Sequence, residues 1–401
     1  MPFPDPIHIS KNSFQEVVVT AVGVISPLGR NYREAVASLR EGRDCAAPVT
    51  QFDVSKCRCH TAAQIPDDWL EDGRDTRNRI HRASRMMVMA VRELLAQDPA
   101  FLPEMMIAGT TSGGMSFGED FFRSLLKHSP GIHTASLLAN YSPQKMVQDA
   151  LSAADFRIPS QIIANACASG SNAIGHAFNL IRRGKFQRVI CGGFDAISEL
   201  VFVGFDSLQA STPGRCSPFD KDRTGLVLGE GAALLALESR ESAERRGASI
   251  LGKVTGYGIS TDNFHLTQPH PSGIGPRLAM ERALASAGRQ KVDYINAHGT
   301  ATTFNDATEG IAICELFEDG VPVSSTKSMM GHSLGAAGAI EAVISLIALR
   351  EQFLPPNINF NQSDLPLKIV ANHSRPASIQ SVLSNSFGFG GTNAALVLEK
   401  A

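Results

Sequence analysis

The sequence contains no uninterrupted apolar run of about 18 or more residues, so it predicts no transmembrane helix. Charge of one sign is not in excess either. The 37 Lys and Arg against 39 Asp and Glu leave a net charge of -2, which creates no global field for nucleic acid or an anionic membrane. The first residues lack the basic stretch and apolar core of a secretory signal. Seven scattered cysteines, an odd number, favour the reducing cytoplasm over a disulfide framework.

The tightest group of possible metal ligands is Cys57, Cys59 and His60. A zinc site would need a second ligand pair at a suitable spacing, and none follows. We therefore expect no metal, and we interpret these residues as alternating positions in a strand or as part of a surface loop.

The sequence does contain enough apolar residues for a large core, because 43% of it is hydrophobic and 19% charged. Glycine is abundant, with 35 residues, and small residues let helices and strands approach closely. A length of 401 residues exceeds one compact core and favours more than one domain. Short apolar runs, expected to be strands, alternate with helical patterns; they lie at residues 17–24, 106–109, 160–165 and 188–191. This alternation predicts an α/β protein with a mostly parallel sheet covered on both faces.

The chain also repeats itself at low resolution. Residues 252–260 echo the first strand and its glycine turn, and Cys167 and His332 each stand before small residues that continue into an apolar helix. This spacing is far longer than a solenoid repeat and predicts duplication of a whole domain. We place the N-terminal half, with the cysteine, at residues 1–250 and the C-terminal half, with two histidines, at residues 251–401. The N-terminal ends of the equivalent helices would then face one cleft.

Cys167 follows an apolar strand and precedes small residues that open a helix. A helix N-terminus favours the thiolate, so we expect the pKa of this thiol to be lowered. The small neighbours leave room for a substrate carbonyl. A buried structural cysteine is the alternative, but the strand–cysteine–helix context favours a nucleophile.

Two histidines occur in comparable settings. His298 follows a strand and precedes glycine and the hydroxyls of Thr300 and Thr302, so it is expected to project into a cleft. His332 opens the second small-residue helix. The glycines around it do not form a phosphate loop, because Lys327 precedes them.

Two further segments accompany the histidines. Lys327 and Glu341 lie in apolar surroundings, which favours a partly buried ion pair over a solvated one. Residues 387–391 read Phe-Gly-Phe-Gly-Gly, which predicts a tightly turned loop with two large rings. This loop either lines an acyl pocket and offers N–H groups to an oxyanion, or is a glycine-rich turn with core aromatics.

In combination, these motifs resemble the elongating β-ketoacyl-(acyl carrier protein) synthases, the KAS I/II class of the thiolase superfamily. The residues that carry the resemblance are Cys167, His298, Lys327, His332, Glu341 and Phe387. The similarity extends from about Val17 to the C-terminus. It implies a thiolase-like duplicated fold with five layers, α-β-α-β-α.

The resemblance also implies the reaction. Cys167 would carry an acyl group, and His298 and His332 would promote decarboxylation of a malonyl thioester and stabilise the enolate. Lys327 and Glu341 would be supporting charges. The enolate would attack the acyl-cysteine in a decarboxylative Claisen condensation, and the product would be 3-oxoacyl-ACP.

For the substrate path, the resemblance implies that Phe387 is a gate whose N–H joins that of Cys167 in an oxyanion hole. The other expected substrate-binding residues are Thr300 and Thr302, which would hold the pantetheine arm, and Ser112, Met115 and Phe389. Ser112 stands where similar synthases often carry Ile, which predicts a deeper or more polar acyl pocket. The alternative is that Ser112 packs against another element of the fold.

No bound cofactor is implied, because substrates would arrive on the phosphopantetheine of an acyl carrier protein. A homodimer is expected, or a heterodimer with a chain-length factor, in fatty-acid or type II polyketide or polyene synthesis. Two alternatives are a thiolase-type acyltransferase and a non-catalytic chain-length-factor-like subunit. A thiolase needs a second cysteine in the late glycine-rich loop, where none occurs, and a chain-length factor lacks the nucleophile.

A basic run in this near-neutral chain could dock the acidic carrier protein. Arg79, Arg82 and Arg85 have nearly helical spacing, and Arg215 is a further candidate from the resemblance. Charges at the rim of an interface mainly accelerate encounter. The alternative is a solvated helix end.

Overall fold

The computed structural model describes residues 14–70, 80–127 and 132–401. One eleven-stranded sheet, in the order β13-β11-β10-β15-β16-β9-β1-β8-β6-β4-β5, runs through the molecule. Its strands are β1 (Val17–Ile25), β4 (Met105–Gly109), β5 (Ser160–Ile163), β6 (Arg188–Asp195), β8 (Gly231–Ser239), β9 (Gly252–Thr261), β10 (Tyr294–Asn296), β11 (Pro322–Ser324), β13 (Lys368–Ile369), β15 (Ser381–Gly388) and β16 (Thr392–Glu399). Two small sheets are formed by β2 (Ala47–Pro48), β3 (Thr61–Ala63) and β7 (Leu228–Gly229), and by β12 (Phe353–Leu354) and β14 (Arg375–Pro376).

The large sheet consists of two similar sets of strands. In the first half the order is β5-β4-β6-β8-β1, and in the second it is β11-β10-β15-β16-β9, so corresponding strands occupy corresponding places. The two sets join where Val17–Val19 of β1 pairs with Gly252–Val254 of β9. This topology confirms the duplicated fold.

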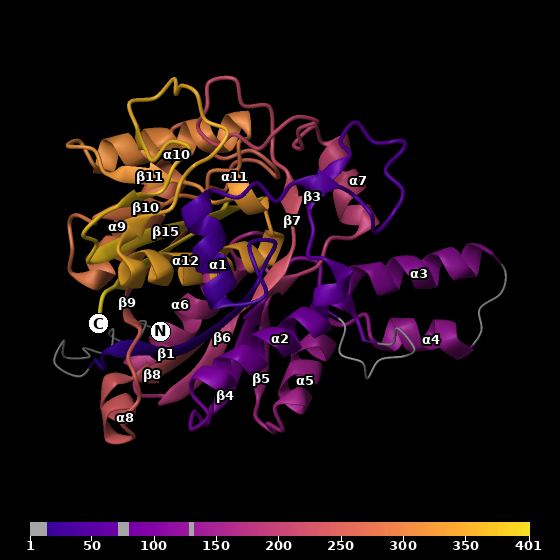
Figure 1. Cartoon of the computed structure of the whole chain (residues 1–401), viewed down its shortest axis with the longest axis horizontal. Helices are drawn as coiled ribbons and strands as arrows, with labels where there is room; N and C mark the ends of the chain where they lie inside the picture. Colours follow the sequence, from indigo (N-terminus) through magenta and orange to yellow (C-terminus); the bar gives the residue numbers. More distant parts are fainter. Residues whose placement is uncertain (1–13, 71–79, 128–131) are drawn as a thin grey trace, which may run out of the picture.

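The helices complete the layers. They are α1 (Tyr32–Glu41), α2 (Arg82–Gln97), α3 (Met115–Leu126), α4 (Ile132–Ala139), α5 (Pro143–Ala153), α6 (Ser169–Arg182), α7 (Glu199–Ser207), α8 (Arg240–Arg245), α9 (Ile274–Ala287), α10 (Thr303–Leu316), α11 (Lys327–Met330) and α12 (Ala337–Glu351), with short 3-10 turns at Asp67–Leu70 and Leu334–Ala336. Helices α6 and α12 lie between the two sets of strands, α2 and α5 cover one outer face, and α9 and α10 cover the other (Figure 1). The order of layers is therefore α-β-α-β-α.

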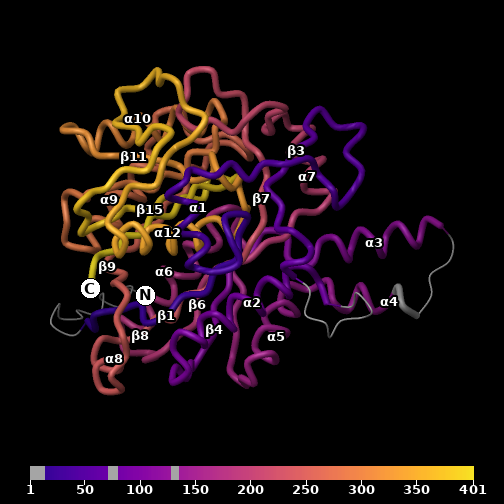
Figure 2. The backbone as a smooth tube through the Cα atoms, in the orientation of Figure 1, coloured from indigo at the N-terminus to yellow at the C-terminus, as the bar shows by residue number. Residues whose placement is uncertain are grey.

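The composition of α12 explains its central position. Every residue from Ala337 to Leu349 is buried, and all of them except Glu341 and Ser345 are apolar or glycine. A helix with no polar face belongs in the interior. By contrast, α3 and α4 extend away from the body of the molecule (Figure 2). No helix in the described ranges is long and apolar enough to cross a bilayer.

The sheet is mixed rather than mostly parallel, which corrects the expectation from sequence. β4 pairs in parallel with β5 and β6, but β8 is antiparallel to both β1 and β6. In the second half, β16 is likewise antiparallel to its neighbours. The reason is that the last strand of each half runs back between the first strand and the fourth.

Candidate active site

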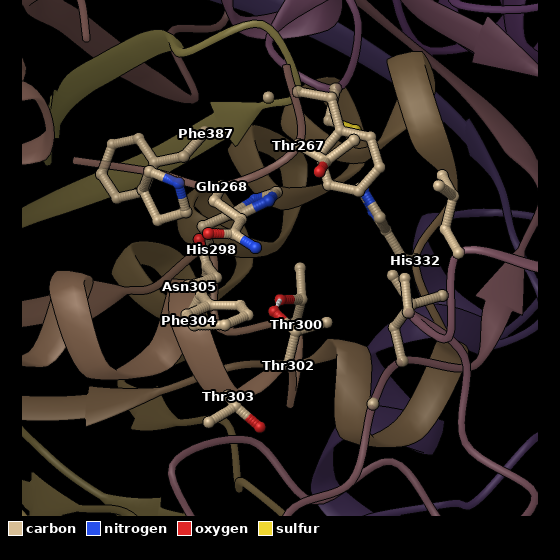
Figure 3. A pocket seen from close by; sticks show the side chains of 18 of the residues that line it. Thr267, Gln268, His298, Thr300, Thr302, Thr303, Phe304, Asn305, His332 and Phe387 are labelled. Atoms are coloured by element: carbon tan, nitrogen blue, oxygen red, sulfur yellow. Dashed lines mark hydrogen bonds between the residues drawn. The ribbon is translucent and has the colours of Figure 1, made fainter. Parts of the chain in front are cut away.

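Residues from both halves line one cavity of about 180 Å³ (Figure 3). It brings together seven of the residues selected from the sequence: Cys167, His298, Thr300, Thr302, His332, Phe387 and Phe389. Sequence reasoning missed other lining residues, among them Phe205, Gln268 and Asn305. Lys327 and Glu341 lie just behind the cavity wall and are fully buried.

Cys167 stands at a constrained turn between β5 and α6. Ala166 adopts a left-handed φ of 55°, which is unfavourable for a residue with a Cβ. The Ser169 hydroxyl accepts from the Asn165 N–H at 2.9 Å and donates to the Ala166 carbonyl at 2.6 Å, and these bonds hold the turn. Strain of this kind persists only where the surroundings impose it. The turn directs the thiol into the cavity ahead of the helix.

Burial raises the pKa of the Cys167 thiol to about 12. Lys327 and the backbone N–H groups of Phe389 and Cys167 itself oppose this effect and lower the pKa. Loss of hydration outweighs these lowering effects, so the expectation of a lowered pKa is wrong. The thiol is protonated at rest and must lose its proton as it reacts.

The same contacts correct the assignment of the second oxyanion donor. The N–H that reaches the thiol belongs to Phe389, not to Phe387. The Phe389 ring stacks on Phe205 of α7, with ring centroids 5.4 Å apart and an interplanar angle of 20°. The Phe387 ring instead packs edge-on against the His298 ring, with ring centroids 5.8 Å apart. The sequence could not separate the two because they have nearly identical neighbours.

The two imidazoles lie together, with ring centroids 5.2 Å apart and nearly perpendicular planes (Figure 3). Burial and the positive charge of Lys327 hold the pKa of both His298 and His332 well below the usual range. Both rings are therefore neutral at pH 7, and each carries one N–H. The Nδ1 atoms of both rings are buried, and neither has a hydrogen-bond partner among the described residues.

Lys327 and Glu341 form an ion pair in which both side chains are completely buried. The sequence predicted the pair, although with partial burial. Burial raises the pKa of Glu341 to about 7, and Lys327 acts in the opposite direction. The pair places a positive charge behind both histidines.

Two carboxylates that sequence reasoning missed hold the backbone around His298. Glu309 accepts from the N–H groups of His298 and Gly299 at 2.9 and 2.8 Å, and from Asn385 Nδ2 at 3.0 Å. Asp306 accepts from Thr300 N–H at 2.9 Å and from Ala301 N–H at 3.1 Å. The sequence feature that could have revealed them is the spacing of Asp306 and Glu309, three residues apart in the first turns of α10.

A third buried carboxylate explains Ser112. Asp195 accepts from the Ser112 hydroxyl at 2.8 Å, from Thr110 Oγ1 at 2.6 Å and from Gly335 N–H at 2.7 Å. Ser112 is thus buried in a hydrogen-bonded turn and does not line the catalytic cavity. Met115 also lies outside that cavity, and it lines an apolar hollow of about 610 Å³ between α3, α4 and α7.

The predicted docking arginines fall into different settings. Arg82 is only 16% exposed and is paired with the fully buried Glu230 at 2.7 Å and with Asp67. Docking is therefore the wrong role for Arg82, which neutralises a buried acid. Arg85 is half-buried on the same helix, and Arg79 lies outside the described residues. Arg215 is exposed and contacts Asn359 at 3.5 Å.

Comparison with known proteins gives consistent matches. The N-terminal domain model of the beta-ketoacyl synthase family matches residues 14–243, and its C-terminal domain model matches residues 251–361. The chain is 37% identical over 414 residues to 3-oxoacyl-(acyl-carrier-protein) synthase 2 of Synechocystis sp., covering 96% of this chain and 98% of that protein.

Two solved structures are similar over nearly the whole chain. The ishigamide ketosynthase/chain length factor has a TM-score of 0.91 and 35% identity, covering 97% of this chain and all of that one. A ketosynthase in complex with its chain length factor from Xenorhabdus doucetiae has a TM-score of 0.82 and 29% identity, covering 98% of this chain and all of that one.

Proposed function

We propose that Cys167, His298 and His332 carry out the reaction of this chain. The chain belongs to the beta-ketoacyl synthase family and forms 3-oxoacyl-(acyl carrier protein) by condensation. The observation that carries these roles is the convergence of one thiol, two neutral imidazoles and two N–H donors in a single buried cavity. The same arrangement disfavours a non-catalytic subunit, since such a subunit has no use for a nucleophile.

The first step is acyl transfer to Cys167. The Cys167 sulfur attacks the thioester carbonyl as the thiol gives up its proton, which passes to the departing pantetheine sulfur. The N–H groups of Cys167 and Phe389 donate to the oxyanion that forms, and such donors stabilise the transition state most in a site without water. The pantetheine sulfur then leaves and takes the proton.

The second step releases CO2 from a malonyl thioester and leaves an enolate. Nδ1 of both rings is buried and has no acceptor among the described residues, so a proton on Nδ1 would be a buried donor without a hydrogen bond. Each ring therefore carries its N–H on Nε2. These two N–H groups donate to the enolate oxygen. The enolate carbon attacks the acyl-Cys167 thioester, the new C–C bond forms, and the thiolate of Cys167 leaves.

The proposed carrier of both substrates is the phosphopantetheine arm of an acyl carrier protein, and no resident cofactor takes part. Thr300 and Thr302 line the cavity, with their hydroxyls 2.8 Å apart, and can hold the arm. Arg215 lines a polar surface groove and is the exposed one among the described candidates for attracting an acidic carrier protein. Because the extender would be carrier-bound malonate, we expect the reaction in the cytoplasm, in fatty-acid or type II polyketide or polyene synthesis.

We further propose that a second copy of this chain covers the α3/α4/α7 patch. We use this name for the exposed apolar residues Phe122, Leu126, Leu138, Leu200 and Val203. Contiguous apolar surface of this kind typically marks an interaction site. The solved structures of two similar ketosynthases include a chain length factor, so ketosynthases of this kind do pair with another chain. A chain-length factor on this patch is the competing outcome.

The direct test supplies the purified protein with an acyl-carrier thioester and malonyl carrier protein. We expect 3-oxoacyl-ACP and CO2. Cys167→Ala should form no condensation product yet still release CO2, because the histidine pair remains. His298→Ala or His332→Ala should lower CO2 release by roughly 100-fold, the typical cost of losing one charge-stabilising donor. Undiminished CO2 release from both histidine variants would contradict their assigned role.

A further inference from the structure

Strand β15 and helix α12, which carry site residues, meet helix α6, which follows Cys167, at a buried point outside the catalytic cavity. Ser171 lies in α6, one helical turn after Cys167, and Ser386 lies in β15. Their hydroxyl oxygens are 2.8 Å apart, and both side chains are completely buried. Gly338 of α12, six residues after His332, closes the point from the third side. We call this point the Ser171–Ser386–Gly338 junction.

The junction is packed without spare room. A Cβ on Gly338 would lie 2.2 Å from Ser171 Oγ and 2.6 Å from Ser386 Oγ. A Cβ on the neighbouring Gly170 would lie 2.7 Å from the carbonyl oxygen of Gly335. Close-packed surfaces of this kind transmit small displacements rather than absorb them. A shift of β15 along α6 would therefore break the hydroxyl bond or push α12 aside.

The junction leads directly to the thiol. β15 continues from Ser386 into the turn that carries Phe389, whose N–H reaches Cys167. A Cβ on the intervening Gly388 would lie 3.1 Å from Cys167 N. The register of β15 against α6 therefore sets the distance between the two N–H groups that face the thiol.

Two other side-chain bonds join residues 165–172, around Cys167, to the second half. Thr392 Oγ1 donates to the Asn165 carbonyl at 3.2 Å, and the Tyr257 hydroxyl donates to Asn172 Oδ1 at 2.7 Å. The first comes from β16 and the second from β9. Of the three bonds, only that of Ser171 ends on β15, the strand that leads to Phe389.

We propose that Ser171 is a positioning residue for acyl transfer: its bond to Ser386 fixes the two N–H groups of the oxyanion site relative to each other. This inference rests on the proposed function, because it concerns the oxyanion of that reaction. Misplacement of a reacting group by about 1 Å can cost up to about 100-fold in rate. Loss of one buried hydroxyl bond should have a smaller effect, about tenfold.

The test compares Ser171→Ala, Ser386→Ala and the double variant in two half-reactions. We expect the rate of Cys167 acylation at saturating acyl carrier thioester to fall about tenfold, while KM and CO2 release from malonyl carrier protein stay within about twofold. The double variant should be no slower than either single one, because both hydroxyls serve one bond. Ser84→Ala removes a buried hydroxyl in α2, far from the junction, and should acylate like the wild type.

Two results would overturn the inference: an unchanged acylation rate, or a parallel fall of both half-reactions that follows the melting temperature. The second result would mean that the bond only stabilises the fold. A wild-type protein that fails to acylate Cys167 would instead contradict the proposed function. The two failures are therefore distinguishable.

Discussion

The Cys167 thiol lies buried in the cavity between the two halves, and this burial sets its reactivity. Its sequence context predicts a nucleophile, because an apolar strand precedes the cysteine and small residues after it begin a helix. Burial within the folded protein nevertheless raises its pKa to about 12. Such burial depends on residues from both halves, which no local pattern contains.

The raised pKa predicts the pH dependence of alkylation. Only the thiolate reacts with iodoacetamide. Because the pKa of Cys167 is about 12, the alkylation rate at this residue should rise about tenfold for each pH unit between pH 7 and 9. Peptide mapping by mass spectrometry at several pH values measures this rate. A plateau already reached near pH 7 would mean a low-pKa thiolate and would restore the interpretation from the helix N-terminus.

Arg82 and Arg215 should respond differently to mutation. Arg82→Ala leaves Glu230 buried without its ion partner, a change that typically costs about 3–5 kcal/mol, and should lower the unfolding midpoint in urea. Arg215→Glu should leave the midpoint unchanged, because Arg215 is exposed, but should raise KM for carrier-bound substrates.

Small pantetheine thioesters provide the control for Arg215, since they need no docking surface. Their turnover by Arg215→Glu should stay near the wild-type value. Equal loss with both kinds of substrate would show that Arg215 does not dock the carrier protein.

At the scale of elements, apolar strands were predictable and their directions were not. β6 was expected at residues 188–191 but extends to Asp195, because Gly192 and Gly193 ended the apolar run in the sequence. The antiparallel placement of β8 and β16 follows from the path of the chain between distant strands. Periodicity does not contain this information.

The backbone conformation of the segment between β10 and α10 depends on hydrogen bonds to Glu309. Both of its oxygens accept hydrogen bonds from N–H donors, so a glutamine at this position would turn an NH2 group toward at least one of them. We expect Glu309→Gln to cost about 1–3 kcal/mol of stability, the penalty for a buried unsatisfied group.

The same variant should lose CO2 release more than Cys167 acylation, because Glu309 holds the histidine and not the thiol. Urea unfolding and the two half-reaction rates measure both effects. Wild-type stability together with wild-type CO2 release would show that Glu309 does not position His298.

At the scale of the whole molecule, the duplicated layers were predictable because two long segments echo each other. The α3/α4/α7 patch was not, since Leu138, Leu200 and Val203 look like core residues in an amphipathic helix until their exposure is known. An apolar periodicity does not say whether its face is covered by the same chain or by another one.

The patch predicts the state of association. Leu138→Asp combined with Leu200→Asp should convert a dimer into a monomer, because each charge would be buried against apolar surface. Sedimentation velocity measures the change. Leu102 is at least as exposed as Leu138 and Leu200 but lies outside the patch, so Leu102→Asp should remain dimeric. A wild-type monomer that associates only with a chain-length factor would favour the heterodimer.

We propose that acyl groups pass through a covalent intermediate on Cys167 before condensation. Intact-mass spectrometry followed by peptide mapping, after mixing with an acyl carrier thioester, tests it most directly. We predict one acyl adduct, located on Cys167, that disappears when malonyl carrier protein is added and reappears as 3-oxoacyl-ACP. An adduct on Cys57, Cys59 or Cys216, or no adduct while product still forms, would contradict the account.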